Sequence, residues 1–294
     1  MRISLALAAV SLMALSVAPA RAQDAGSFLR GILRAIPGAS APAPAEQSAP
    51  QPSLLRDTSE QEEIRIGRQL AGNLLGAAPL VKDDALQGYV NRVGRWVASQ
   101  SDRPELKWHF GVLDADSINA FALPGGYVFI TRGLLRALAS EAELAAVLGH
   151  EIGHVAMKHH LKILKQTQGM DLASSLLGQQ VNRGGLQGAA LQTVLGKGAE
   201  ALARGLDKDA EYEADRLAVV FATRAGYDPY AMAGVLQKLA RANPREPSVA
   251  LLFKTHPLPQ ERLDKLGDAM RDSFDRYADG KSLAERFQRV ASLP

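Results

Sequence analysis

The chain has 294 residues, of which 47% are hydrophobic and 22% are charged, and it contains no cysteine. This composition is typical of a globular protein and excludes collagen-like, coiled-coil and disulfide-stapled classes, as well as cysteine nucleophiles and thiolate metal ligands. The pI is about 9.1, but it reflects a surplus of only three charges without a dense Lys/Arg cluster, so no nucleic-acid partner is expected. Any metal site must therefore use histidine and carboxylate ligands.

Residues 1–22 have the layout of a cleaved signal peptide. Arg2 precedes an apolar run over 3–17, and the small residues Ala20 and Ala22 indicate cleavage after Ala22. A membrane anchor or a buried helix is the alternative, but this run is short for a bilayer span. A secreted eukaryotic chain would more often carry disulfides or an Asn-x-Ser/Thr acceptor, and this chain has neither, so a bacterial periplasm is the expected location.

Residues 23–56 are rich in Ala, Pro, Ser and Gln, which predicts an extended linker. Within it, apolar side chains over residues 28–36 recur at helical spacing beside two arginines. This short segment is predicted to contact a membrane surface or an envelope protein, or else to pack on the protein's own body. The folded domain is expected over 57–270, followed by a helical tail over 271–294.

The first elements expected in the folded part are two helices, over 57–75 with a cap at Thr58 or Ser59, and over 86–100. Strands rich in Phe, Val, Ile and Tyr follow over 106–114 and 118–131. The second of these segments contains a Pro-Gly-Gly turn, which predicts a hairpin. A small antiparallel sheet is therefore expected.

Helical patterns resume over 133–140, and a long helix is expected to start at Ser140, with Glu143 completing a capping box. Residues 161–204 read as two amphipathic arms around a glycine-rich turn and could form a lid. Three more helical patterns lie within residues 209–226, 230–243 and 255–272. The fold class is therefore α+β and mainly helical.

The motif His150-Glu151-Ile152-Gly153-His154 lies in the long helix. Residues four apart point the same way, so the two histidines can present imidazole nitrogens to one ion. Zinc suits such a pair, and an open zinc site admits a water that a nearby carboxylate can deprotonate. Glu151 is the candidate for that base. The alternative is a helix with two solvent-facing histidines, which the apolar flanks of the motif disfavour.

A third ligand is expected in the acidic segment over 211–215. At about 100° per residue, Glu211 and Asp215 share one helix face, while Glu213 points about 200° away from Glu211. The economical assignment makes Glu211 the third ligand and Asp215 the acceptor that fixes the N–H of a ligating histidine. The alternative is an ordinary acidic helix face, because acidic runs on helices are common.

The remaining histidines lack a clear connection to the metal by spacing. His159 and His160 follow the first ligand by nine and ten residues, which turns both away from the ion while the helix continues, so both are expected at the surface. His109 is predicted to be a strand histidine without a role. His256 precedes a proline and stands six residues before Arg262, and no spacing rule ties either residue to the ion.

The chain contains, in this order, NAFALPGGYVFITRGLL, SEAELAAVLGHEIGHVAMKH, EYEADRLA and THPLPQERL. With these segments it resembles the zinc metallopeptidases grouped as family forty-eight, which include the HtpX-type membrane proteases, the CAAX prenyl proteases and the OMA-type mitochondrial proteases. The resemblance extends over about 60–263. It implies a gluzincin fold with the sheet beside the H-E-x-x-H helix, and one zinc ion per chain held by the ligands already assigned from spacing.

The resemblance also implies a substrate site and two further residues near the zinc. His256 and Arg262 would stabilise the oxyanion that develops during hydrolysis. From its ligand type and loop position, His256 is also hypothesised to occupy the open zinc position and hold the enzyme latent. An extended polypeptide would pair by β-augmentation with an edge strand. The residues of that strand are Asn119, Ala120, Phe121 and Ala122.

The function expected from these features is a periplasmic zinc endopeptidase, similar to the soluble branch of the family, that cuts misfolded or unassembled envelope proteins. The step from protease to quality control rests on family analogy. The alternative is a non-proteolytic or latent chaperone that binds extended polypeptides, although a pure binding module has no need of a base such as Glu151. A set of two histidines and one glutamate favours zinc over cobalt or manganese.

Overall fold

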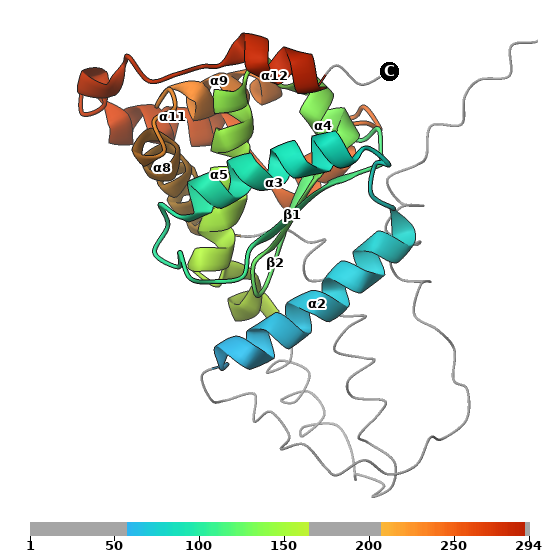
Figure 1. The fold of residues 1–294 in the computed structure, drawn as a ribbon. Coiled ribbons are helices and arrows are strands. Elements are labelled where there is room, and N and C mark those ends of the chain that lie inside the picture. The colour runs from blue at the N-terminus through green and yellow to red at the C-terminus, as the bar shows by residue number, and fades with distance from the viewer. Residues whose placement is uncertain (1–57, 165–206, 292–294) are drawn as a thin grey trace, which may run out of the picture.

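The computed structural model describes residues 58–164 and 207–291 of the chain. Within these ranges, helices surround a three-stranded sheet (Figure 1). The predicted signal peptide, the linker with its segment over 28–36, and nearly all of the predicted lid lie outside the described residues. In the described part of the chain, no helix is both long and apolar enough to cross a membrane.

Helices α2 (Glu60–Ala77) and α3 (Asp84–Ala98) begin the described chain and confirm the first two predicted helices. Ser59 caps α2, because its hydroxyl accepts a hydrogen bond from the Glu62 backbone N–H at 3.2 Å. The Asp83 carboxylate caps α3 through the backbone N–H of Leu86 at 3.0 Å. Both starts are thus fixed by local sequence.

The sheet consists of β1 (His109–Leu113), β2 (Ala120–Leu123) and β3 (Tyr127–Thr131), in the order β1-β3-β2. Strands β2 and β3 form the predicted antiparallel hairpin, whose turn contains two glycines with positive φ, Gly125 and Gly126. The expectation of a purely antiparallel sheet was wrong, because β1 pairs with β3 in parallel. Two successive chain reversals return β3 to the direction of β1, and β3 then occupies the centre of the sheet.

The remaining helices follow the sheet along the chain and confirm a mainly helical α+β fold. They are α4 (Arg132–Ala137), α5 (Glu141–Ala156), α8 (Lys208–Arg224), α9 (Ala231–Ala240), α10 (Ala250–Thr255), α11 (Pro259–Met270), the short 3-10 helix η1 (Asp275–Tyr277) and α12 (Ala284–Ala291).

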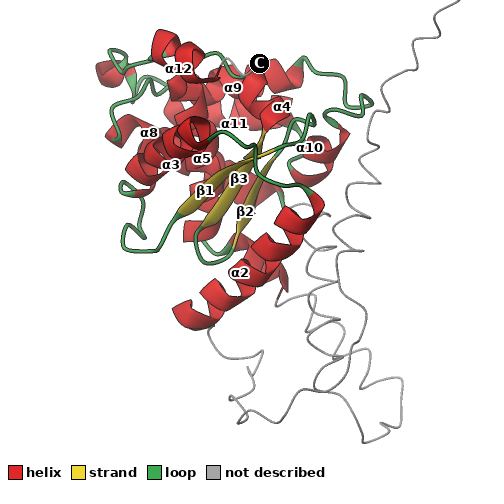
Figure 2. Ribbon diagram, turned by 45° about the vertical axis from the view of Figure 1, so that its right-hand side comes forward, coloured by secondary structure: helices red, strands yellow, loops and turns green. Residues whose placement is uncertain are grey.

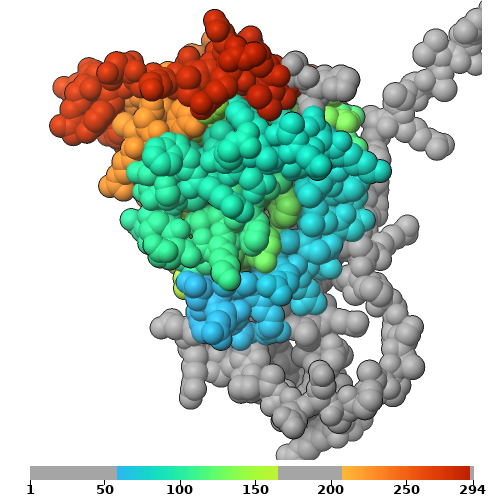
Figure 3. Space-filling model, viewed as in Figure 1, coloured from blue at the N-terminus to red at the C-terminus, as the bar shows by residue number. Residues whose placement is uncertain are grey.

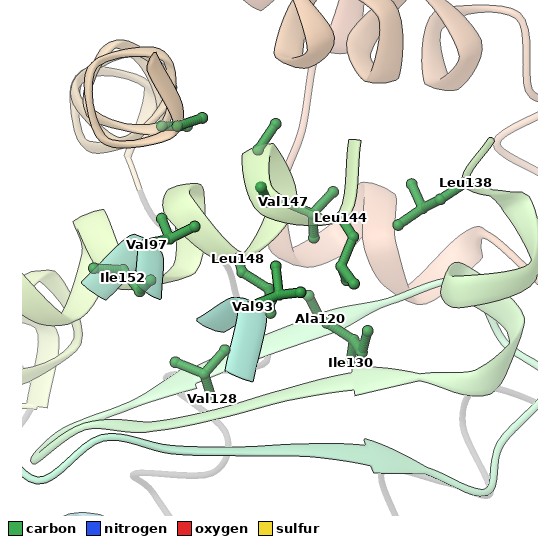
Figure 4. Close-up of a cluster of buried hydrophobic side chains, with 14 of the residues drawn as sticks. Val93, Val97, Ala120, Val128, Ile130, Leu138, Leu144, Val147, Leu148 and Ile152 are labelled. Atoms are coloured by element: carbon green, nitrogen blue, oxygen red, sulfur yellow. The ribbon is translucent and has the colours of Figure 1, made fainter. Parts of the chain in front are cut away.

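The sheet has helices on both faces. Figure 2 shows α2 along one side, whereas α3 and α5 lie on the other. The main core forms between the sheet, α3 and α5 (Figure 4), where Val128 and Ile130 of β3 meet Val93 of α3 and Leu148 of α5. A smaller cluster under α2 contains Leu123 of β2. One face of the sheet thus packs against α5.

Helices α5 and α8 approach each other closely because their facing residues are small. A Cβ atom added at Gly149 would lie 3.2 Å from the Cα of Ala218, and one at Gly153 would lie 3.3 Å from the Cα of Ala214. These two glycines share one face of α5, four residues apart. The close crossing brings the polar residues of α5 against those of α8.

The C-terminal residues pack onto the body of the domain. Phe287 of α12 is 3% exposed and belongs to the main core, and the neighbouring Arg286 pairs with Glu141 at the start of α5. Figure 3 shows the C-terminal segment in red, lying across the top of the molecule. The predicted tail over 271–294 therefore contributes to the packing of α5, at least as far as residue 291.

Candidate metal centre

Helix α5 begins at a well-formed cap and carries the H-E-x-x-H motif in its second half. The Ser140 hydroxyl accepts a hydrogen bond from the Glu143 backbone N–H at 3.2 Å. The Glu143 carboxylate bonds the backbone N–H of Ala139 at 2.7 Å, one residue before the position that a capping box uses. The motif histidines and Glu151 are all buried, which rules out the solvent-facing alternative.

The Nε2 atoms of His150 and His154 lie close to each other and to the Glu211 carboxylate. The two Nε2 atoms are 2.9 Å apart, and Glu211 oxygens lie 3.7 Å from Nε2 of His150 and 3.4 Å from Nε2 of His154. His256 completes the group, because its Nδ1 lies 3.0 and 3.1 Å from the Glu211 oxygens. One donor atom from each of these four buried residues lies within 4.8 Å of the others.

Asp215 and Arg262 contact residues of this group without belonging to it. Asp215 Oδ1 lies 2.9 Å from Nδ1 of His150, as expected for the acceptor that fixes the histidine tautomer. The Arg262 guanidinium forms a bidentate pair with Asp215 through Nε at 2.8 Å and Nη2 at 2.6 Å. Its Nη1 lies 2.9 Å from Glu211 Oε2. Arg262 thus holds Glu211 and Asp215 of α8 in place.

The charges at the site set the protonation of its acids. Burial alone would raise the pKa of Glu211, but the charges of His256 and Arg262 outweigh it and hold that pKa well below its usual range. Burial likewise opposes ionisation of Asp215, and Arg262 reverses the balance, so the pKa of Asp215 is lowered. Both carboxyl groups are therefore ionised at neutral pH.

Glu151 has a different environment from the other acids. Its Oε2 has no hydrogen-bond partner among the described residues, and Nε2 of His256 lies 3.9 Å from its Oε1. Burial is the largest influence on this carboxyl and raises its pKa. A carboxylate with a raised pKa and a free oxygen is suited to accept a proton.

This donor set fits one zinc ion. Because the Nδ1–H of His150 faces the Asp215 carboxylate, the Nε2 lone pair of His150 is left pointing at His154 and the negatively charged Glu211. Burial also pushes the pKa of His154 well below its usual value, which keeps this ring neutral. Neutral imidazole nitrogens and a carboxylate are the ligands that zinc prefers.

The structure corrects the prediction that His159 is a surface residue. Helix α5 ends at Ala156, and Lys158 adopts a left-handed conformation with φ of 57°. This turn brings His159 back toward the site, where it is 4% exposed and its Nδ1 lies 2.9 Å from Nδ1 of His154. The neighbouring His160 is only partly exposed, and burial lowers its pKa to about 3.

His159 was not predicted near the site because the helix was expected to continue past Ala156. Met157 and Lys158 give no strong stop signal such as Gly or Pro. His109, by contrast, lies at the exposed start of β1 and stacks on Tyr127, away from the metal group. That position confirms the prediction that His109 lies in a strand.

The predicted substrate residues lie along the sheet edge. Strand β2 pairs with β3 on one side, and in the described part of the chain no strand pairs with its other side. Helix α5 packs against this strand. The side chains of Asn119, Ala120 and Ala122 are buried and that of Phe121 is half-buried, so backbone groups are the main contacts that this edge can offer.

Comparisons with known proteins agree with this architecture. The model of peptidase family M48 matches residues 84–270. The chain is 34% identical over 212 residues to the beta-barrel assembly-enhancing protease of Escherichia coli K12. The matched residues make up 69% of this chain and 42% of that protein. It is 27% identical over 208 residues to the mitochondrial metalloendopeptidase OMA1 of Schizosaccharomyces pombe, covering 69% of this chain and 60% of the relative.

A third relative is the metalloprotease LoiP of Escherichia coli K12, 29% identical over 163 residues that make up 55% of this chain and 62% of that protein. The matched part thus spans less than half the length of the assembly-enhancing protease and about 60% of the other two relatives. The family match contains every residue of the metal group and both residues behind it.

Proposed function

The chain belongs to peptidase family M48, a family of zinc metallopeptidases, and we propose that it is a zinc-dependent endopeptidase acting on misfolded or unassembled cell-envelope proteins. The observation that carries this proposal is the pairing of a buried histidine–carboxylate group with Glu151, whose free oxygen faces no other partner in the described structure. A site built only to hold a metal has no need of that carboxylate.

In the proposed mechanism His150, His154 and Glu211 hold the zinc ion. When bound, zinc supplies a Lewis acid that acidifies a water molecule and polarises the peptide carbonyl. Glu151 takes the proton from the attacking water and later delivers it to the leaving amine. Asp215 holds the proton of His150 at Nδ1, which keeps Nε2 available as a ligand.

Two roles for His256 fit the geometry. Its Nδ1 contacts Glu211 and its Nε2 faces Glu151, so with substrate bound it could donate a hydrogen bond to the oxyanion. Its membership in the four-residue group also supports the hypothesis of a latent state in which His256 caps the zinc. Arg262 is best assigned to positioning, because its contacts with Asp215 and Glu211 leave it turned toward those carboxylates rather than toward a substrate.

The substrate proposal combines the position of β2 as an outer strand of the sheet with the relatives. An extended polypeptide would pair with residues 119–122 by main-chain hydrogen bonds. Envelope proteins are proposed as substrates because one relative is named a beta-barrel assembly-enhancing protease and because the leader predicts export. A periplasmic location and a membrane or partner contact through residues 28–36 belong to the same proposal. Liposome flotation with and without residues 23–53 tests the contact.

The proposal is tested by digesting unfolded casein with the purified mature chain and with Glu151→Gln, each carrying equal bound zinc measured by elemental analysis. The wild-type chain should cleave and the variant should not. Equal zinc ensures that the base, rather than the metal, has been removed, and the inactive variant excludes a contaminating protease. Equal cleavage by both proteins would overturn the role of Glu151.

The alternative is a latent enzyme or a chaperone, and it is favoured by the position of His256 beside Glu211. If the wild-type chain binds zinc but cleaves nothing, His256→Ala separates the two. Cleavage that appears in this variant identifies a capped peptidase. Continued inactivity, together with suppression of aggregation of an unfolded client, identifies a chaperone instead.

A further inference from the structure

A chain of three side chains leads from the metal group to the protein surface. Nδ1 of His154 lies 2.9 Å from Nδ1 of His159, and Nε2 of His159 lies 3.0 Å from Oε2 of Glu213. The side chains of the two histidines are 0% and 4% exposed, whereas that of Glu213 is 37% exposed. The row therefore starts in the interior and ends at solvent.

Two backbone features bring these residues together. The left-handed turn at Lys158 folds His159 back beneath the last turn of α5. Glu213 lies two residues after Glu211 on α8. Its side chain therefore points to a different side of that helix and not toward the metal group. His159 is absent from the group that could hold a metal, because it contacts His154 on the ring nitrogen opposite the one that faces Glu211.

The hydrogen atoms along this row can be placed in only one consistent order once Nε2 of His154 is a metal ligand. That ring must then carry its proton on Nδ1, which makes it a donor toward His159. His159 must accept on Nδ1, so its own proton sits on Nε2 and is donated to Glu213. The carboxylate, which can only accept, terminates the row.

We propose that His159 and Glu213 are positioning residues that fix the tautomer and ring orientation of His154 for zinc binding. This inference rests on the proposed function, since it requires that His154 binds the ion through Nε2. The row is the counterpart of the direct contact between Asp215 and His150. Each ligating histidine then has an acceptor for its second ring N–H, as metal-bound histidines generally do.

The contribution of His159 is tested by measuring the zinc dissociation constant through competition with a chromophoric chelator. His159→Leu keeps the buried volume and removes the acceptor, and it should weaken zinc binding about 10- to 100-fold. His159→Asn places an acceptor oxygen near the original Nδ1 and should recover part of this loss. Unchanged affinity in His159→Leu, or equal loss in both variants, would overturn the proposal.

Glu213 provides an independent test at a partly exposed position where folding is not at risk. Glu213→Ala should weaken zinc binding less than His159→Leu does, and Glu213→Gln, which keeps an acceptor oxygen, should bind more tightly than Glu213→Ala. Because Glu213 acts through His159, adding Glu213→Ala to His159→Leu should cause no further loss. Asp209→Ala removes the same charge from an exposed position on α8 and should leave affinity unchanged.

Different results would overturn the proposed function and the role of His159 and Glu213. An unaltered chain that binds no zinc would overturn the proposed function and this inference with it. The inference about His159 and Glu213 alone would be overturned if the unaltered chain binds zinc and cleaves casein while Glu213→Ala binds zinc as tightly as the Asp209→Ala control. Circular dichroism and thermal unfolding without zinc verify that the variants fold, and if His159→Leu does not, the Glu213 variants decide the outcome.

Discussion

Helix α5 carries two buried glutamates whose carboxylates meet opposite conditions. Glu141, at the start of the helix, accepts hydrogen bonds from the hydroxyls of Tyr89 and Tyr227, each at 2.7 Å, and from the guanidinium of Arg286. Glu151, about three turns later, is 2% exposed and has an oxygen without a partner in the described structure. Both carboxylates are therefore buried, but among the described residues only that of Glu141 has hydrogen-bond partners for both of its oxygens.

The pKa values of the two groups diverge for this reason. Burial acts to raise the pKa of both carboxyls. At Glu141 the bonds from Arg286, Tyr227 and Tyr89 outweigh burial and lower the pKa, whereas at Glu151 burial prevails and the pKa is raised. A satisfied buried carboxylate stabilises a fold, while an unsatisfied one costs stability and indicates a chemical role. The following changes test that division along one helix.

The largest effect is expected from Glu151→Gln, which removes the proposed base without removing side-chain volume. We expect kcat/KM for an unfolded substrate to fall by about 10²- to 10⁴-fold, the usual contribution of a general base. Urea unfolding should show no loss of stability, because the variant removes an unsatisfied buried charge. A destabilised Glu151→Gln would show instead that this carboxylate supports the fold.

The second effect concerns stability and is expected from Glu141→Ala. The change leaves two buried tyrosine hydroxyls without their acceptor and frees Arg286, so the free energy of unfolding should fall by about 3 kcal/mol. Urea denaturation with the zinc content held equal measures this loss. At temperatures where the variant is folded, kcat should remain close to that of the unaltered chain. A large fall in kcat without loss of stability would contradict the division.

A smaller effect is the pH dependence that Glu141 contributes. Its pKa is lowered on folding, so the folded state binds that proton less tightly than the unfolded chain does. The stabilisation is complete above the unfolded pKa of about 4.3 and is lost as the pH falls through the folded pKa. The stability difference between the unaltered chain and Glu141→Gln should therefore shrink on acidification below that pH. A constant difference between pH 7 and pH 3 would contradict this sign.

The smallest effect is expected at the cap that starts the helix. Ser140→Ala removes the hydrogen bond to the Glu143 backbone N–H and should lower the free energy of unfolding by about 1 kcal/mol. Ser59→Ala removes the equivalent bond of the same length from α2, at a more exposed position, and serves as the matched control. Chemical denaturation should show a larger loss for Ser140→Ala than for Ser59→Ala.

Features that depend on one helix could be predicted from the sequence. The caps at Ser59 and Ser140 are local hydrogen bonds, and the four-residue spacings of His150 with His154, and of Glu211 with Asp215, follow from helix geometry alone. Three of the four residues of the metal group, His150, His154 and Glu211, were therefore expected from helix spacing, whereas His256 was expected only from the family resemblance; the structure places all four together.

Features that depend on how elements meet could not be predicted in the same way. The sequence suggested an antiparallel sheet because neighbouring strands often pair, but β3 lies between β1 and β2. His159 was expected at the surface because nothing in the local sequence announced the end of α5. The contact of Arg286 with Glu141 joins residues 145 positions apart, which no spacing rule addresses.

The sequence by itself determined the caps of the helices and the shared faces of His150 with His154 and of Glu211 with Asp215, because each depends on contacts within a few residues. Tertiary structure alone decided which carboxylate is satisfied and which is left free, and which histidine stands behind His154. These properties depend on the side chains that other elements bring to a buried position, where water cannot replace a missing partner. The chemical difference between Glu141 and Glu151 thus arises from their neighbours and not from their type.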